Sequence, residues 1–332
     1  MSAHPQTLLL TRSDVERALP WEACIAGVEE AFRIHAEGRS LPPGVLAVPS
    51  AGGGFHVKAA GLTLQRSYFA AKANGNFPDN PRRNRLPAIQ GVIVLCDAED
   101  GRVLALMDSM EVTLRRTAAA SAVAARRLAR PESEVVTVCG CGAQGRAHLR
   151  ALSHVLPVRR AFAFDVDREA SRLFARQMSA ELGIEVVVTP ELAAGTTASD
   201  VCVTCTPSRE AFLRPEHVRA GTFVAAVGAD APNKQEVHPA LLAAATVVVD
   251  VLDQCAESGD LHHALARGAM TRGDVHAELA DLVTGRRPGR IHAEQTFVFD
   301  STGTALEDVA AAALVYENAT AAGAGTRVAL GG

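Results

Sequence analysis

The middle of the chain alternates short apolar runs with helix-length segments, and this pattern constrains the fold more than any other feature. The runs are rich in β-branched residues and are typical of buried strands: Val135–Cys139, Ala161–Phe164, Glu185–Val188, Val201–Cys205, Thr222–Val227 and Thr246–Val251. Helical patterns such as Arg168–Leu182 lie between them. Strands separated by helices favour a parallel sheet that is covered on both faces. We therefore predict a doubly wound α/β domain of the Rossmann type.

The segments on either side of this region predict an α+β domain with a mostly antiparallel sheet. They comprise a helical pattern, a Pro/Gly-rich stretch and strand-like pieces, in the order Ser13–Gly38, Leu41–Gly54, Phe55–Ala59, Ser67–Lys72, Ile89–Asp97 and Val103–Asp108. A helix over Arg116–Ala129, which Pro131 would stop, leads into the α/β region. The tail from Leu306 to about Gly323 is again helical and could pack on the first domain.

Charge and composition exclude several classes of protein. The net charge of -4 and the lack of a basic face argue against nucleic-acid binding. No apolar run approaches the ~20 residues of a membrane span, and no export signal opens the chain, so we expect a cytoplasmic protein. The cysteine pairs Cys139/Cys141 and Cys202/Cys205 lack a second pair at zinc spacing. We expect small buried thiols and no metal site.

A glycine loop follows the first of the central strands. Gly140-Cys-Gly-Ala-Gln-Gly145 fits the G-x-G-x-x-G pattern, directly follows a strand and opens a helix. The first glycine permits a tight turn, the second lets the backbone approach a pyrophosphate, and the third lets the helix close on the strand. The residues predicted to contact a dinucleotide here and at the strand ends are Gly140, Gly142, Ala143, Gln144, Gly145, Asp165, Thr204 and Val227.

Asp165 ends the next strand and indicates which dinucleotide binds. A carboxylate at this point accepts hydrogen bonds from the ribose hydroxyls and repels a 2′-phosphate. The sequence therefore predicts NAD as the cofactor. Arg168 lies close enough to leave NADP open.

Three basic residues, an acid and a histidine are candidates for chemistry on an amino acid. Lys58 and Lys72 lie on strand-like segments with apolar neighbours. A lysine in such a place needs either an ion pair within the protein or a substrate to bind. Arg116, at the predicted start of a helix, opposes the helix dipole and needs an anion such as a substrate carboxylate. Asp230 follows the fifth strand and could be a general base, or could cap a turn. His56 lies near Lys58 and could line the substrate pocket.

These residues belong to segments that resemble the ornithine cyclodeaminase/μ-crystallin family over nearly the full chain. The matching segments are Lys72–Asn80, Leu104–Asp108, Arg116–Ala119, Gly140–Gln144, Val227–Asp230, Lys234–Glu236 and Phe299–Gly303. The resemblance implies a homodimer. In each protomer, a Rossmann domain (118–303) would be inserted into a substrate-binding and dimerisation domain (1–117 with 304–332).

The resemblance also implies roles for individual residues. Lys72 and Arg116 would hold the substrate carboxylate, and Asp230 would be the acid/base group near the amine. Further residues would lie near the nicotinamide half of the cofactor: Thr117, Lys234 and Ser301.

The chain departs from the cyclodeaminases at the edge of the pocket. They carry an Arg in the segment that here reads Leu41–Gly44 and an acid near His56, and many members have Met where this chain has Lys58. A more basic pocket disfavours ornithine and suits a small imino or keto acid, whose second carboxylate Lys58 could bind. We therefore predict an NAD(H)-dependent amino acid dehydrogenase or ketimine reductase. A cyclodeaminase that recycles NAD internally and a μ-crystallin-like binding protein are the alternatives.

Overall fold

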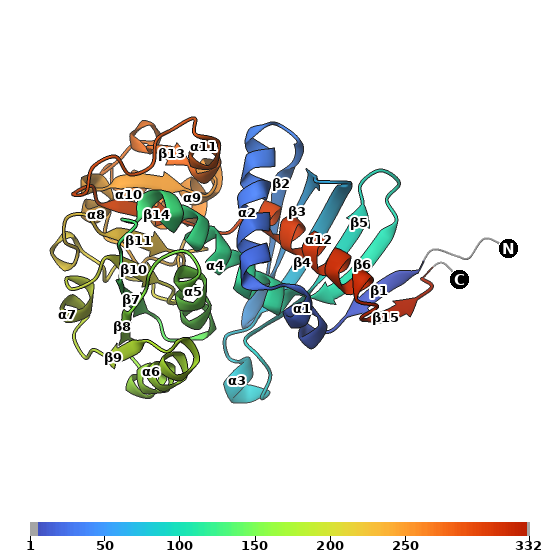
Figure 1. Ribbon diagram of the computed structural model, residues 1–332, viewed down its shortest axis with the longest axis horizontal. Helices are drawn as coiled ribbons and strands as arrows, with labels where there is room; N and C mark the ends of the chain where they lie inside the picture. Colours follow the sequence, from blue (N-terminus) through green and yellow to red (C-terminus); the bar gives the residue numbers. More distant parts are fainter. Residues whose placement is uncertain (1–5, 331–332) are drawn as a thin grey trace. The chain divides into compact units, whose positions relative to one another are not determined.

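The computed structural model describes residues 6–330, which form two compact units (Figure 1). One unit consists of the residues up to Arg116 and those from Thr304 onward, and the other is Thr117–Gly303. Helix α4 (Ser109–Leu128) carries the chain from the first unit into the second. In the described part of the chain, no helix is both long enough and apolar enough to cross a membrane.

The first unit is built on a seven-stranded sheet with the order β15-β1-β6-β5-β4-β3-β2. Its pairs are antiparallel except that β1 runs parallel to β6. The strands are β1 (Thr7–Leu10), β2 (Ser40–Ser50), β3 (Gly53–Thr63), β4 (Ser67–Asn76), β5 (Ile89–Asp97), β6 (Val103–Asp108) and β15 (Thr326–Val328). The helices of this unit, besides the start of α4, are α1 (Arg12–Ala18), α2 (Trp21–Ala36), α3 (Asn80–Arg83) and α12 (Ala305–Ala321).

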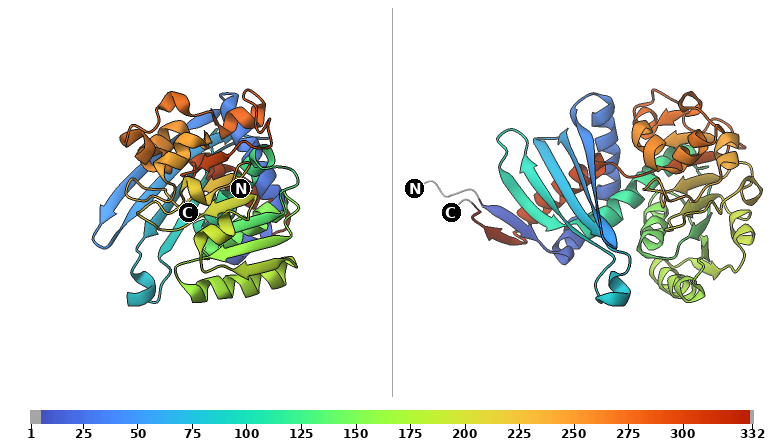
Figure 2. Two further views of the ribbon diagram at one scale, coloured as in Figure 1. Left: turned by 90° about the vertical axis from the view of Figure 1, so that its left-hand side faces the viewer. Right: turned by 180° about the vertical axis from the view of Figure 1, so that it is seen from behind.

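Helices α2 and α12 cover one face of this sheet (Figure 2). Side chains alternate between the two faces of a strand, so directly paired residues share a face. Ala60, Ala70 and Ile93 are buried beneath the helices. On the opposite face, Leu46 and Phe55 are about half exposed, at 59% and 47%.

The structure corrects two predictions for this unit. Residues 41–50 of the Pro/Gly-rich stretch, to which no strand had been assigned, lie in an edge strand, β2, with a register shift between Leu41 and Gly44. An edge position tolerates proline because one row of backbone N–H groups needs no partner. Helix α4 begins at Ser109 and not at Arg116, because Asp108 accepts hydrogen bonds from the backbone N–H groups of Met110 and Glu111. Arg116 therefore does not face a helix N-terminus.

The second unit contains an eight-stranded parallel sheet with the order β13-β12-β14-β11-β10-β7-β8-β9. Its strands are β7 (Val135–Cys139), β8 (Arg160–Phe164), β9 (Glu185–Val188), β10 (Val201–Thr204), β11 (Phe223–Ala226), β12 (Thr246–Val249), β13 (Ala277–Glu278) and β14 (Phe297–Asp300). The α-helices are α5 (Ala143–Ser153), α6 (Arg168–Leu182), α7 (Leu192–Thr196), α8 (Pro239–Ala244), α9 (Leu252–Ser258), α10 (Asp260–Ala266) and α11 (Leu279–Thr284). The predicted α/β fold class is confirmed.

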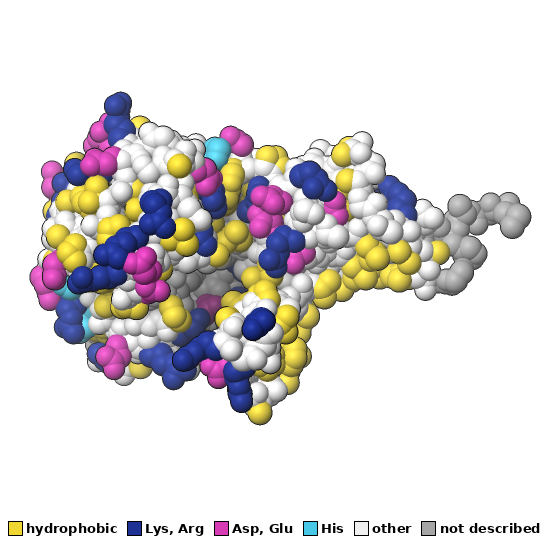
Figure 3. All heavy atoms as spheres, turned by 90° about the horizontal axis from the view of Figure 1, so that it is seen from below, with side chains coloured by type: hydrophobic (Ala, Val, Ile, Leu, Met, Phe, Trp, Pro, Cys, Tyr) yellow, Lys and Arg dark blue, Asp and Glu magenta, His cyan; other side chains and the backbone are white. Residues whose placement is uncertain are grey.

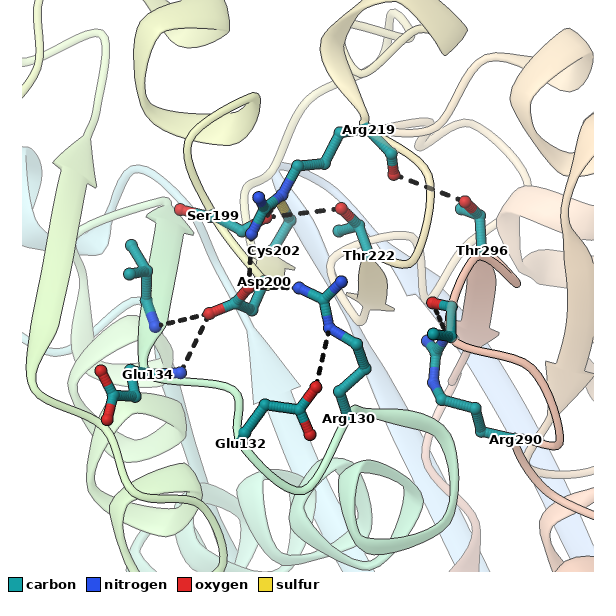
Figure 4. A network of polar contacts seen from close by, with 12 residues as sticks. Arg130, Glu132, Glu134, Ser199, Asp200, Cys202, Arg219, Thr222, Arg290 and Thr296 are labelled. Atoms are coloured by element: carbon teal, nitrogen blue, oxygen red, sulfur yellow. Dashed lines mark hydrogen bonds and ion pairs between the residues drawn. The ribbon is translucent and has the colours of Figure 1, made fainter.

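A buried carboxylate ties together the amino ends of the central strands (Figure 4). Asp200 accepts hydrogen bonds from the backbone N–H groups of Glu134 (2.9 Å) and Val135 (3.0 Å) and pairs with Arg130 and Arg219. Burial alone would raise the pKa of Asp200, but these hydrogen bonds and charges lower it. The cluster holds the end of the sheet that lies opposite the glycine loop.

Candidate active site

The glycine loop has the geometry that a dinucleotide requires. Gly140 adopts φ 103°, a conformation that L side chains rarely reach. A Cβ on Gly145 would lie 2.2 Å from the carbonyl oxygen of Gly140, so only glycine lets α5 close on β7. Gly142 precedes the first residue of α5, Ala143, and a Cβ on Gly142 would meet no atom within 4 Å. Its backbone is open to a phosphate at the helix N-terminus.

Asp165 shapes this loop from the end of β8. Its carboxylate accepts hydrogen bonds from the backbone N–H groups of Cys141 (2.8 Å) and Asp167 (3.0 Å). Each oxygen keeps a further lone pair, so the half-buried carboxylate can also accept from a ribose hydroxyl. The Oε1 atom of Gln144 is buried and has no hydrogen-bond partner among the described residues. These features fit the dinucleotide predicted from the sequence.

Glu236 holds together the loops that follow β10 and β11. Its fully buried carboxylate accepts hydrogen bonds from the Thr204 hydroxyl (2.8 Å), the Thr206 N–H (2.6 Å) and the Gly228 N–H (2.8 Å). Burial raises the pKa of Glu236, although these donors oppose the rise. Thr204, a predicted cofactor contact, is buried, and its hydroxyl donates to Glu236.

The segment that Glu236 anchors carries the predicted acid/base residue. Asp230 has a half-exposed side chain and forms an ion pair with Lys234 at 2.5 Å. Val227 follows β11, and its N–H donates to the carbonyl of Thr204.

The remaining predicted cofactor residues lie on other elements of this unit. The buried Ser301 hydroxyl, just after β14, donates to the Asp250 carboxylate at 2.9 Å. Thr117 is half-buried on α4.

In the first unit, Lys72 and Arg116 converge on one carboxylate. Asp308, in the first turn of α12, lies 2.7 Å from the Lys72 ammonium and 2.9 Å from the Arg116 guanidinium. Arg116 also pairs with Glu307 at 2.8 Å. All four side chains are buried, with at most 5% of each exposed.

This arrangement perturbs the titration of both partners. Burial, with the nearby charge of Arg116, lowers the pKa of Lys72 to about 7. Burial would raise the pKa of Asp308, but Arg116 and Lys72 outweigh it and lower that pKa. A perturbed buried lysine beside an arginine is typical of functional sites.

Sequence reasoning missed the two acids of this cluster. Glu307 and Asp308 stand in an Ala-rich helix, where buried acids require partners. The sequence did carry one signal for Glu307, a Thr three residues before a Glu, which is typical of a capping box. In the structure the Glu307 carboxylate accepts a hydrogen bond from the Thr304 N–H. No sequence pattern indicated that the same two acids would meet the basic pair.

Lys58 and His56 lie on β3, beside the strand that carries Lys72. Lys58 is the direct cross-strand partner of Lys72 and is half-buried, whereas His56 is paired with Asn74 and is exposed. Across the described residues, no group of three His, Cys, Asp or Glu side chains is placed to hold a metal ion.

Gly142→Ala tests the open loop. The variant should fold with unchanged thermal stability, because the free protein has room for the Cβ, yet the Kd for NADH should rise at least about tenfold, or about 1.4 kcal/mol. Fluorescence titration with NADH measures this change. Gly273→Ala is the matched control, since its Cβ would meet only Thr271 Oγ1 at 3.7 Å. Unchanged NADH affinity in Gly142→Ala would contradict a phosphate at this position.

Glu236→Gln tests the buried anchor. In this variant an amide N–H₂ group, which can only donate, replaces one oxygen that accepts hydrogen bonds. At least one buried donor then loses its acceptor, so the free energy of unfolding should fall by about 1–3 kcal/mol. Denaturant unfolding measures this loss. The exposed Glu191→Gln serves as control and should lie within about 0.5 kcal/mol of the parent. Equal stability of the two variants would show that Glu236 does not brace the loops.

Comparison with known proteins places this geometry in a family. The model of the ornithine cyclodeaminase/mu-crystallin family matches residues 5–323. The alanine dehydrogenase of Archaeoglobus fulgidus is 36% identical over 97% of this chain and 98% of its own length. The iminosuccinate reductase of Paracoccus denitrificans is 37% identical over 80% of this chain and 79% of its own length.

A solved structure agrees with these sequence matches. An archaeal alanine dehydrogenase dimer with bound NAD superposes with a TM-score of 0.93 at 36% identity and covers 98% of this chain and 99% of that chain. The relatives are oxidoreductases of amino and imino acids by name, which confirms the predicted class of activity. This chain belongs to the ornithine cyclodeaminase/μ-crystallin family.

Proposed function

We propose that this protein is an NAD(H)-dependent oxidoreductase that interconverts a small α-amino acid and its imino acid. The observation that carries the proposal is the buried pair of cations, Lys72 and Arg116, in a chain that also has an open dinucleotide-type loop at Gly142. Cations in this setting suit the carboxylate that every α-amino acid carries. The relatives named alanine dehydrogenase and iminosuccinate reductase support this class of substrate.

The residues of this chain would bind the carboxylate and move one proton. Lys72 and Arg116 hold the substrate carboxylate, with Asp308 keeping both cations in place. As the Cα–H bond breaks with its electron pair, Asp230 takes a proton from the amine, and it returns that proton in the reverse direction. NAD, when bound, supplies the acceptor for the hydride.

An assay of NADH consumption tests the proposal. Pyruvate, glyoxylate or oxaloacetate with ammonium, or a cyclic imine carboxylate, should cause loss of NADH absorbance in proportion to the amino acid formed. A cyclodeaminase would instead release ammonia from a diamino acid without net change in NADH. A binding protein would turn over none of these compounds. Either result would overturn the proposed function.

Lys72→Met should lower kcat/KM about 10- to 100-fold, the effect of one lost charge-assisted hydrogen bond. Binding of NADH should be retained, which serves as the control for folding. In the parent enzyme, KM for the keto acid should rise above pH about 7. There Lys72, whose pKa is lowered to about 7, loses its positive charge while the substrate carboxylate keeps its own. A pH-independent KM from pH 6 to 9 would argue against Lys72 as a carboxylate ligand.

We also propose that the protein is a homodimer that uses the uncovered face of the first unit's sheet. Apolar side chains gather along one side of this unit (Figure 3). On the face of β2, β3 and β5 opposite α12, the exposed apolar residues include Leu41, Leu46, Val48, Phe55 and Val92. A contiguous apolar face of this kind marks an association surface. The archaeal alanine dehydrogenase, described as a dimer, supports the same assembly.

Phe55→Asp should convert the dimer to monomer, because each copy would bury an unpaired carboxylate at a two-fold interface. Sedimentation equilibrium measures the mass in solution. Ile291→Asp, an exposed apolar position of the second unit, is the matched control and should remain dimeric. A dimeric Phe55→Asp variant would rule out this face.

A further inference from the structure

A buried histidine in α5 has no role in the proposed reaction. His148 is fully buried, and both nitrogens of its imidazole ring are hydrogen-bonded. Nδ1 lies 2.8 Å from the carbonyl oxygen of Gln144, and Nε2 lies 3.1 Å from the hydroxyl oxygen of Ser121. A leucine would fill a similar volume without polar atoms that need partners. The two hydrogen bonds are therefore what a histidine contributes at this position.

These contacts fix the protonation state of the ring. A backbone carbonyl can only accept, so Nδ1 carries the proton and donates to Gln144. Burial lowers the pKa of His148 to about 4, which leaves the ring neutral at ordinary pH. Nε2 of a neutral ring then accepts, and the Ser121 hydroxyl donates to it. His148 is thus a bridge that donates on one side and accepts on the other.

The bridge connects two helices, α5 and α4. Gln144 is the second residue of α5, in the turn that follows the glycine loop. Ser121 is fully buried on α4 among alanines, where a hydroxyl needs a partner. The same helix carries Arg116. The His148 side chain therefore holds the first turn of α5 against α4.

The other side of the glycine loop is held by the neighbouring strand. The Gly140 N–H donates to the carbonyl of Phe164 at 2.9 Å, and the Cys141 N–H donates to the Asp165 carboxylate at 2.8 Å. These contacts end at Cys141. The first N–H groups of α5 have no acceptor within the helix, and they are the groups that a pyrophosphate would bind. Their direction depends on the turn that His148 holds.

We propose that His148 is a positioning residue for the dinucleotide. Through Ser121 and the Gln144 carbonyl, it holds the phosphate-binding turn of α5 in the geometry that NADH requires. Donors that are held in place before the ligand arrives need not be ordered on binding, so less binding free energy is lost. The inference concerns cofactor binding alone, so it does not depend on which substrate the protein turns over.

The test measures the Kd for NADH by fluorescence titration, together with the free energy of unfolding in denaturant. In His148→Leu, the Kd should rise about fivefold or more, which corresponds to about 1 kcal/mol. Ser121→Ala should raise the Kd by a smaller factor, because His148 keeps its bond to Gln144. The double variant should have the same Kd as His148→Leu, because both substitutions break one bridge.

Ser199→Ala is the matched control. The Ser199 hydroxyl is fully buried and bonded to Thr137 Oγ1 at 2.7 Å, but Ser199 precedes β10, at the end of the sheet opposite the glycine loop. This variant should lose stability as Ser121→Ala does, yet keep the parent Kd for NADH.

Three results would overturn the positioning role of His148. They are an unchanged Kd in both Ser121→Ala and His148→Leu, an equal rise of the Kd in Ser199→Ala and Ser121→Ala, and effects that simply add in the double variant. Should His148→Leu not fold, the comparison of the two serine variants decides, because each removes only a hydroxyl.

Discussion

The buried ion pairs of the Asp308 carboxylate hold the first unit's candidate substrate-binding residues in place. This carboxylate joins Lys72 of β4 and Arg116 of α4 to the first turn of α12, so three elements distant in sequence share one buried ion cluster. Removing one partner of a buried pair leaves an uncompensated charge, which typically costs about 3–5 kcal/mol. The cluster therefore orders the cations before any substrate arrives. A substrate carboxylate therefore binds side chains that are already held in position, so less of the binding free energy is lost in ordering them.

Buried carboxylates perform a comparable task in the second unit. Glu236 braces the loops after β10 and β11, and the backbone N–H groups of Glu236 and Val237 donate to Asp260. Asp300 at the end of β14 in turn accepts from the N–H groups of Asp260 and Leu261. Burial and neighbouring acids raise the pKa of Asp300 to about 7. These acids fix backbone positions at the carboxyl edge of the sheet, where ligands of such folds bind.

The sequence predicted the second unit well, because its signals are local. Short β-branched runs separated by helical patterns reproduce β7 to β12, and the glycine loop needs only the backbone conformation of Gly140 and the close packing of Gly145. The first unit was harder to predict. A proline-containing edge strand such as β2 and the start of α4 at Ser109 depend on pairing and capping that a sequence pattern does not show.

The sequence by itself determined which residue types had to be paired or used. Lys58, Lys72 and Arg116 are too costly to bury alone, whatever the fold. Only the tertiary structure decided their partners: Asp308 and Glu307 reach the basic pair because α12, from the far end of the chain, packs on β3 and β4. Likewise only the register of β3 against β4 sets Lys58 opposite Lys72. The need of a buried charge for an opposite charge nearby is a property of the residue itself. Whether an opposite charge is present depends on contacts between segments that are remote in sequence.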